Sequence, residues 1–241
     1  MQNQYHITEV GQGKVDQQQD MFRLTIPPVT GDIYHNAQIT SYITRRDFEF
    51  EPPVSLHIRA YATGDIHGTA GFGFWNHPYG RVPRLPKAIW FFYGSQPNNM
   101  PLAKNIPGYG WKCATFDAAN WRFLALLPSA PIGFLLMRLP SIYNQLWGIG
   151  QRALGVDECL LDETLLNIPH DYSIIWEKDH VTFMLDNKII FKTKRVPRGK
   201  LGFIAWIDNQ YAIVTPQGQF GHGLLPLNAS QELRLESILF E

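Results

Sequence analysis

The chain has 241 residues, of which 45% are hydrophobic and 13% aromatic, enough to bury a large core in one domain. Its 21 basic and 21 acidic residues give a formal net charge of zero. That balance excludes a strong attraction of the molecule as a whole to nucleic acid or to an anionic membrane, so we expect no nucleic-acid partner.

The first twenty residues are polar, and the stretch QGKVDQQQD has no hydrophobic period. We expect residues 1–20 to be a polar, partly ordered tail and residues 21–241 to be a single domain. The N-terminus also lacks the basic and apolar regions of a secretory signal, which predicts a cytoplasmic protein unless a leader has been removed.

Cysteine usage and apolar run length exclude further classes. Cys113 and Cys159 are far apart in the chain and have no metal-ligand spacing around them, so no disulfide framework is indicated and both are expected to be buried thiols. The longest apolar run, 123–137, contains Pro128 and Pro131 and is shorter than the ~20 residues that cross a bilayer. No transmembrane helix is predicted.

Strands begin after the N-terminal tail. The segments MFRLTIPPV, AQITSYITRRDFEF and PVSLHIRAYAT are rich in β-branched and aromatic residues and nearly alternate between apolar and polar positions. Alternation divides the last segment into two faces, one with Leu56, Ile58 and Ala60 and the other with His57, Arg59 and Tyr61. The first face is expected to pack in the core, and the second to meet solvent or a ligand.

The stretch 64–95 contains two strands of unusual composition. TAGFGFWN places Gly71 and Gly73 on the same face as Trp75, and glycine inside a strand marks either a bend or the close approach of a ligand. Both alternatives imply a curved sheet. KAIWFFYGS is apolar throughout, which is typical of a strand buried on both faces or of an aromatic-lined cleft.

Residues 117–160 form a mostly helical, apolar insertion. DAANWRFLALL predicts a short helix that Pro128 ends, and the following segment predicts one or two more, interrupted by Pro140. The insertion is interpreted as a cap over a sheet edge, as a lid, or as a flap that makes peripheral membrane contact through residues 123–149. Four residues offer apolar surface for the second interpretation: Phe134, Leu135, Met137 and Trp147.

Strands resume after the insertion. HDYSIIWEKDHVTFMLDNKIIFKT predicts a meander with turns at EKDH and at Asp186-Asn187. LGFIAWI predicts another strand followed by a loop, and ELRLESILFE predicts a final strand with Leu233, Leu235 and Ile238 directed inward.

The succession of AQITSYITRRDFEF, VSLHIRAYAT, GTAGFGFWN and HDYSIIWEKDHVTFMLDNKIIF is similar to the strand order of the concanavalin A-like lectin/glucanase superfamily, with family 16 glycoside hydrolases as the nearest match. The similarity covers residues 30–95 and 168–240, and its most specific piece is HDYSIIWEKDHVTFMLDNKII. The resemblance implies an all-β jelly-roll sandwich of two antiparallel sheets, whose concave sheet holds the site.

The chain departs from this family where hydrolysis takes place. In the family, the strand after the GFGFW-like segment carries Glu, Asp and Glu at alternate positions, and retaining hydrolysis needs two carboxyls only ~5 Å apart. The corresponding residues here, 88–93, contain no acid, and no Asp or Glu occurs between Asp65 and Asp117. The hydrolytic mechanism of the family is therefore not expected at these positions.

The remaining candidate for chemistry follows the strand LGFIAWI. Asp208, walled by aromatic rings such as Trp90, Tyr93 and Trp206, would have a raised pKa and could donate a proton near neutral pH. The alternative is an Asp/Asn turn that caps its own backbone.

The predicted site combines Asp208 as the catalytic residue with ligand contacts from the cleft. These contacts are Arg59, Trp75, Asn76, His77, Trp90, Tyr93, Phe134, Trp206, Asn209, Gln210 and Tyr211. No cofactor and no metal are expected, because the glycines lack the context of a phosphate loop and the histidines lack paired spacing.

Basic residues lie in the acid-free stretch. They either form a solvated sheet edge or attract an anionic head on an otherwise apolar ligand. They are Arg81, Arg84, Lys87, Lys104 and Lys112.

Three functions stay open at this point. The first is binding of a largely apolar small molecule, with proton-initiated cyclisation or isomerisation by Asp208 if the protein is an enzyme. The second is a non-catalytic glycan-binding module whose aromatic rings stack on sugars, and the third is a glycoside hydrolase with relocated acids such as Asp208 and Glu177. A closed pocket roofed by the insertion would favour the first, and a broad open groove the second.

Overall fold

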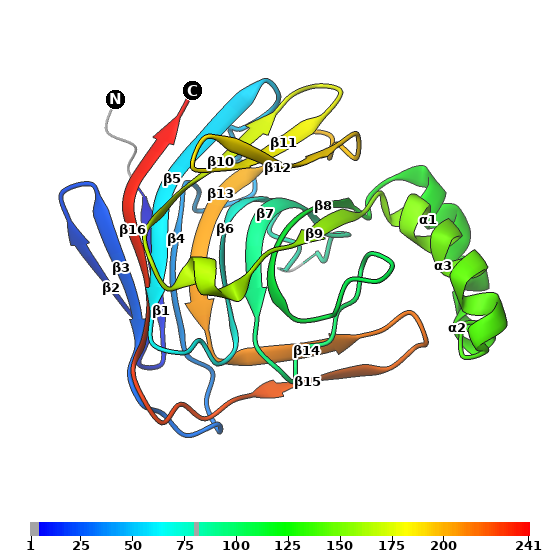
Figure 1. Ribbon diagram of the computed structural model, residues 1–241, viewed down its shortest axis with the longest axis horizontal. Helices are drawn as coiled ribbons and strands as arrows, with labels where there is room; N and C mark the ends of the chain where they lie inside the picture. The colour runs from blue at the N-terminus through cyan, green and yellow to red at the C-terminus, as the bar shows by residue number, and fades with distance from the viewer. Residues whose placement is uncertain (1–4, 80–81) are drawn as a thin grey trace.

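Most of the predicted strands are present and pair into a sandwich, as the computed structural model of residues 5–79 and 82–241 shows (Figure 1). Over these residues the first sheet has the strand order β1-β4-β13-β6-β7-β8-β9, and the second has the order β12-β11-β10-β5-β16-β3-β2. The neighbouring strands in both sheets are antiparallel. This confirms the predicted all-β jelly-roll sandwich.

The strands of the first sheet are β1 (His6–Val10), β4 (Asn36–Thr40), β6 (Thr69–Trp75), β7 (Lys87–Gly94), β8 (Gly110–Asp117), β9 (Asp157–Leu160) and β13 (Gly202–Asp208). Those of the second sheet are β2 (Lys14–Gln18), β3 (Met21–Ile26), β5 (Val54–Thr63), β10 (His170–Trp176), β11 (Val181–Leu185), β12 (Lys188–Thr193) and β16 (Gln231–Phe240). A separate hairpin consists of β14 (Gln210–Val214) and β15 (Phe220–Leu224), and a short 3-10 helix, η2, spans Glu163–Leu166.

Aromatic rings from both sheets fill the space between them. Phe72 of the first sheet lies 5.3 Å from Tyr172 of the second, and Phe91 lies 5.4 Å from Phe183, measured between ring centroids. All four side chains are buried. Because burial of a side chain of this size contributes about 1.5–3 kcal/mol, such cross-sheet pairs hold the two layers together.

The alternation predicted for β5 is confirmed. Leu56, Ile58 and Ala60 are buried in the core, whereas the intervening polar side chains lie on the outer face of the second sheet and are partly exposed. The predicted turns are also present, and Asp186 and Asn187 both have positive φ, 48° and 64°, as a two-residue hairpin loop requires.

The N-terminal segment differs from the expected tail. Residues 6–10 form β1, which pairs with β4, and residues 14–18 form β2, which pairs with β3. Both are edge strands with mostly exposed side chains, held mainly by backbone hydrogen bonds. Their sequence therefore carries almost no hydrophobic period.

The helical insertion is present but shorter than expected, because residues 157–160 form β9. It comprises α1 (Trp121–Leu126), the 3-10 helix η1 (Leu127–Ser129), α2 (Ala130–Leu136) and α3 (Pro140–Leu154). Asn120 caps α1 by accepting hydrogen bonds from two backbone N–H groups, and Gly155 ends α3 in the left-handed conformation. We call residues 118–156 the helical excursion.

The helical excursion projects away from the sandwich beyond the end of β8, at the right of Figure 1. The ring of Phe134 in α2 packs against Phe220 of β15 at 5.7 Å, so the excursion and the β14–β15 hairpin touch. Met137 and Trp147 are buried, whereas Leu135 is exposed, so the four apolar residues named from the sequence do not share one surface. In the part of the chain that the structure describes, no helix is long and apolar enough to cross a membrane.

Candidate functional site

An aromatic cluster lies on the outer face of the first sheet, the face turned away from the core. Alternation along β7 and β13 directs Trp90, Phe92 and Trp206 to this face. The Trp90 ring stacks on Phe92 at 5.5 Å and lies 5.4 Å from Trp206 and 5.5 Å from Phe116 of β8. We call these four residues the aromatic cluster; Trp90, Phe92 and Phe116 are partly exposed, and Trp206 is 7% exposed.

The two glycines of β6 make room for these rings. A Cβ atom on Gly71 would lie 2.9 Å from Cη2 of Trp206 and closer still to the carbonyl oxygen of Phe91. Gly73 has a φ of +150° and lies against the backbone and Cβ of Trp90. The glycines therefore allow two tryptophans to lie close to the sheet. This packing of side chains differs from both alternatives given for the glycines, the close approach of a ligand and a bend in the strand.

Asp208 lies at the end of β13 and is 1% exposed. Its Oδ1 accepts hydrogen bonds from the Thr69 backbone N–H at 3.1 Å, the Thr69 hydroxyl at 2.8 Å and the Gln210 backbone N–H at 3.2 Å. Its Oδ2 accepts from the Tyr34 hydroxyl at 3.3 Å and from Nε2 of Gln210 at 2.8 Å. Burial raises the pKa of Asp208 to about 7, and these hydrogen bonds oppose that rise.

This environment favours the turn-capping alternative for Asp208. The bond to the Gln210 backbone N–H is an Asx turn, and the remaining bonds tie β13 to β6 and to Tyr34. Thr69 also accepts a hydrogen bond from the indole N–H of Trp206 at 2.9 Å, which links the carboxyl to the aromatic cluster. Gln210, which donates to Oδ2, is itself exposed to solvent.

Asn209 is fully buried and joins two loops. Its Nδ2 donates to the carbonyl oxygens of Ile33 and Leu225, both at 3.1 Å, and its Oδ1 accepts from the His35 backbone N–H at 2.8 Å. The predicted ligand contact is wrong for this residue, because its polar atoms bond to the protein. Tyr211 is partly exposed and packs over Gly223 in the β14–β15 hairpin.

Trp75, Asn76 and His77 lie at the opposite end of β6 from Asp208. Trp75 donates its indole N–H to the Tyr42 hydroxyl, which also lies 3.2 Å from Nδ1 of His77. Burial lowers the pKa of His77, and the Arg45 charge lowers it further. Asn76 closes the loop that follows β6 by donating to the Leu85 carbonyl and accepting from the Lys87 backbone N–H, each at 2.9 Å.

Three predicted contacts do not face the aromatic cluster. Tyr93 is an odd number of residues from Trp90, so it lies on the opposite face of β7 and packs against the core, where burial raises its pKa to about 12. Arg59 is on the outer face of the second sheet and pairs with Asp171 and Glu236, each at 3.0 Å. Phe134 lies in the helical excursion against Phe220.

The structure contains a buried ion pair on the outer face of the first sheet that the sequence analysis did not predict. Lys112 of β8 and Glu158 of β9 lie 3.6 Å apart, and both are almost fully buried. Burial lowers the pKa of Lys112 and raises that of Glu158. The backbone N–H of Ala103 donates to Glu158 at 2.9 Å, and Lys112 donates to the Pro107 carbonyl, so the loop after β7 covers this end of the sheet. The signal in the sequence was a single lysine inside the apolar strand WKCATF.

The carboxylates on this face are too far apart for glycoside hydrolysis. In the described strands, alternation directs Asp208 and Glu158 to it, and three strands, β6, β7 and β8, separate them. At about 4.8 Å per strand this is roughly 19 Å across the sheet, against the ~5 Å of a retaining pair and the ~10 Å upper range of an inverting one. Glu177 lies in the β10–β11 turn of the second sheet, so the predicted pairing of Asp208 with Glu177 is not present.

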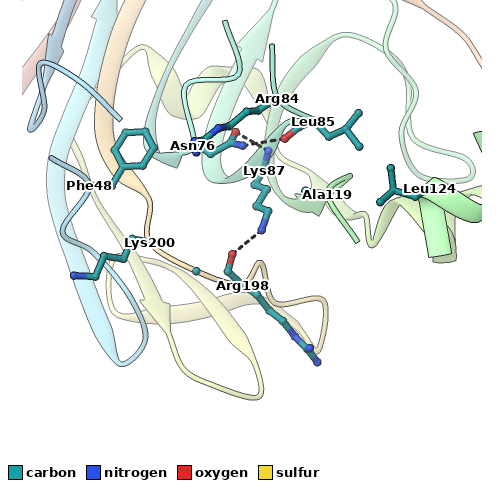
Figure 2. Close-up of a pocket in the computed structure, with 10 residues that line it drawn as sticks. Phe48, Asn76, Arg84, Leu85, Lys87, Ala119, Leu124, Arg198 and Lys200 are labelled. Carbon is teal, nitrogen blue, oxygen red and sulfur yellow. Dashed lines mark hydrogen bonds between the residues drawn. The ribbon is translucent and has the colours of Figure 1, made fainter. Parts of the chain in front are cut away.

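An open pocket of about 430 Å³ lies at the Asn76 end of β6, between the sandwich and α1 (Figure 2). Its wall includes four basic residues, Arg84, Lys87, Arg198 and Lys200, and the apolar residues Phe48, Leu85 and Leu124. Lys87 donates to the Arg198 carbonyl at 2.7 Å and lies 3.7 Å from Asp117. In Figure 2 the side chains of Arg198 and Lys200 extend away from Lys87.

The basic residues named from the sequence thus have different environments. Arg84 and Lys87 line the pocket, Lys112 is buried in its ion pair, and Lys104 donates to the Asn144 carbonyl of α3. Arg81 lies outside the described residues. The prediction that these residues form a solvated sheet edge is therefore wrong for Lys112.

No family model and no curated protein matches the sequence. Solved structures match it over nearly the whole chain. A glycoside hydrolase family 16 endo-glucanase from Bacteroides ovatus has a TM-score of 0.51 and 10% identity, and the match covers 99% of this chain and 96% of that one. The carbohydrate recognition domain of Emp47p has a TM-score of 0.50 and 11% identity, and the match covers 100% of this chain and 88% of that one. At such low identity the likeness shows the fold, and this chain has the concanavalin A-like jelly-roll fold found in lectins and in family 16 glycoside hydrolases.

Proposed function

We propose that the protein binds a carbohydrate on the aromatic cluster and does not hydrolyse it. The observation that carries the proposal is the stacked pair of Trp90 and Phe92, partly exposed on the outer face of the first sheet. The similar structures include a carbohydrate recognition domain and an endo-glucanase, which supports a sugar as the ligand class.

Ring stacking is the physical basis of the proposal. The C–H faces of a sugar ring are apolar enough to pack on an aromatic ring, and hydroxyl groups at its edge stay solvated. Phe116 lies beside Trp90 and is also partly exposed, so more than one ring could be engaged, while the buried Trp206 packs on the other side of Trp90 and supports it. Among the described strands of this face, Asp208 and Glu158 are separated by β6, β7 and β8, so these two carboxyls do not form an acid and nucleophile pair for bond cleavage.

The test compares binding of the unchanged protein with that of Trp90→Ala and Phe92→Ala. We first screen β-glucan and N-glycan oligosaccharides for thermal stabilisation, and then measure Kd by calorimetry. Each substitution is expected to weaken binding by up to about tenfold, since a stacking ring contributes ~0.5–1.5 kcal/mol. Trp121→Ala, which removes the same side chain from the exposed surface of α1, is the matched control and should leave Kd unchanged.

Two results would contradict the proposal. If no oligosaccharide stabilises the protein, or if Trp121→Ala weakens binding as much as Trp90→Ala does, the aromatic cluster is not the site. Release of new reducing ends from any bound oligosaccharide would contradict the non-hydrolytic part alone.

A largely apolar small molecule, with Asp208 as an acid for cyclisation or isomerisation, is a second candidate. The pKa of Asp208, raised to about 7 by burial, favours it, because a protonated carboxyl at neutral pH is what such chemistry needs. Gln210 would have to release Oδ2 first. A panel of isoprenoid and acyl compounds in the same screen tests this candidate, and loss of turnover in a folded Asp208→Asn variant would support it.

A further inference from the structure

The helical excursion differs in charge and polarity from the rest of the protein. Although the chain as a whole has equal numbers of acidic and basic residues, no Asp or Glu occurs from residue 118 to 156. The excursion has three cationic side chains, Arg122, Arg138 and Arg152, all exposed. It is therefore a cationic segment on a neutral molecule.

Large hydrophobic side chains are exposed along the length of the excursion. Trp121 is 73% exposed, Ile132 65% and Leu135 61%, and Leu124, Leu139 and Ile149 are also exposed. Such a concentration of apolar surface on one projecting segment marks a site of interaction rather than ordinary surface variation.

The excursion is attached to the rest of the protein through other residues. Phe134 packs on Phe220, Nε of Arg138 donates to the Gln217 carbonyl at 3.3 Å, and Lys104 donates to the Asn144 carbonyl. Met137 and Trp147 are buried. The exposed apolar residues are thus on a surface that no part of the described chain covers.

We propose that the helical excursion docks on the surface of an anionic lipid bilayer. Apolar side chains of short helices can enter the boundary between headgroups and acyl chains, while arginine side chains extend to the headgroups. The helices α1, α2 and α3 have 6, 7 and 15 residues, fewer than the ~20 that cross a bilayer, and the proposed contact is therefore with the bilayer surface. Trp121, with the Arg122 guanidinium 5.8 Å from its ring centroid, has the amphipathic character of an interfacial anchor.

The basic pocket adds to the charge complementarity. It begins where the excursion leaves the sheet, and Leu124 of α1 forms part of its wall together with Arg84, Arg198 and Lys200, while the fourth basic residue, Lys87, is paired with Asp117. Cations at the base of an apolar segment match anionic headgroups beside acyl chains.

A second copy of the chain fits the excursion less well. In a two-fold symmetric contact the same patch meets itself, so arginines would face arginines with no acidic residue of the excursion to pair with them. A bilayer with anionic lipids supplies the missing negative charge.

The test measures co-sedimentation with phosphatidylcholine vesicles prepared with and without phosphatidylglycerol. We expect association with the anionic vesicles, weaker association with the neutral ones, and a loss at high salt, since the arginines are solvent-exposed. The double variant Ile132→Ser and Leu135→Ser should reduce the partition coefficient about tenfold or more. A blue shift of tryptophan emission on binding, absent in Trp121→Phe, would report insertion of α1.

The matched control is Ile33→Ser with Ile43→Ser. These residues are 60% and 73% exposed, but they lie in loops of the sandwich, so vesicle binding should be retained. The proposal is overturned if neither vesicle is bound, if the control loses binding equally, or if light scattering instead shows a dimer that Ile132→Ser and Leu135→Ser dissociate. Oligosaccharide affinity of the same variants should not change, which separates this test from that of the aromatic cluster.

Discussion

Asp208 illustrates how burial and hydrogen bonding act in opposite directions on one carboxyl. Burial disfavours the charged form, and five donated hydrogen bonds favour it. The outcome is a pKa of about 7, against a value of 3.8 in the unconstrained chain. The native state therefore binds more protons at this position than the unfolded state between about pH 4 and pH 7.

The first prediction follows from this difference. As pH rises through that window, the unchanged protein should lose free energy of unfolding relative to Asp208→Asn, by on the order of 4 kcal/mol in total. Below about pH 4 and above about pH 7 the difference between the two proteins should be flat. Urea denaturation across the pH series measures this difference. If the unchanged protein instead gains free energy of unfolding relative to Asp208→Asn as pH rises, the pKa of Asp208 is lowered in the folded state and the prediction is wrong.

Asp208→Asn should also be less stable than the unchanged protein at pH 4. The new amide NH2 would face donors from Thr69, Gln210 or Tyr34, and leaving such groups unsatisfied costs about 1–3 kcal/mol. A loss of turnover in this variant must therefore be interpreted together with its stability.

The second prediction concerns the two cysteines, which lie directly opposite each other in the β8–β9 ladder and are free thiols. A hydrogen bond from Cys113 lowers the pKa of Cys159 to about 7, while burial raises that of Cys113. Iodoacetamide should modify Cys159 first, at a rate that rises through about pH 7, and Cys113 only after unfolding. Peptide mapping checks the order, and early modification of Cys113 in the folded protein would contradict it.

At the scale of the single element, β6 is shaped by its glycines. The third prediction is that Gly71→Ala destabilises the protein by about 1–3 kcal/mol, because its Cβ would press on the Phe91 carbonyl and the Trp206 ring. Gly133→Ala in α2 is the control: nothing lies within 4 Å of its Cβ, so it should be neutral or stabilise by up to about 1 kcal/mol. Equal effects in urea denaturation would mean that Gly71 is not needed for the close approach of Trp206.

In strand β16 the sequence pattern predicted the inward-facing residues but not the bulge between them. Leu233 and Leu235 are buried, and Ile238 packs against the core although it breaks the alternation. A register shift between Leu235 and Ser237 restores the inward direction at Ile238. The apolar positions alone indicated which residues face inward, and the bulge that makes it possible comes from pairing with β5.

At the scale of the whole molecule, the helical excursion and the β14–β15 hairpin meet through few side chains. The fourth prediction is that Phe134→Ala frees the excursion without unfolding the sandwich, because Phe134 supplies the ring contact to Phe220. Limited proteolysis should cleave within residues 121–154 faster, while the midpoint of global unfolding stays the same. Leu135→Ala, an exposed residue of the same helix, should not change the cleavage rate. A lowered global midpoint in Phe134→Ala would show that the excursion is part of the cooperative core.

The cytoplasmic location expected from the N-terminal sequence stays a prediction, and cell fractionation would test it. It is compatible with docking on the inner leaflet of a membrane, which carries anionic lipids.

Local patterns in the sequence were sufficient for the core strands, the hairpin turns and the sandwich, because alternation and turn chemistry depend on residues next to each other in the chain. They were not sufficient for the edge strands β1 and β2, which are held by backbone pairing and carry no hydrophobic period. The same alternation separates Trp90 from Tyr93, which places one on the outer face and the other against the core. The site depended on contacts between distant residues: the enclosure of Asp208 by Thr69 and Tyr34, and the pairing of Lys112 with Glu158. Burial and pKa are set by whichever strands and loops come to lie across a side chain, and that is decided by the register of the sheets and the path of the loops, which only the tertiary structure contains.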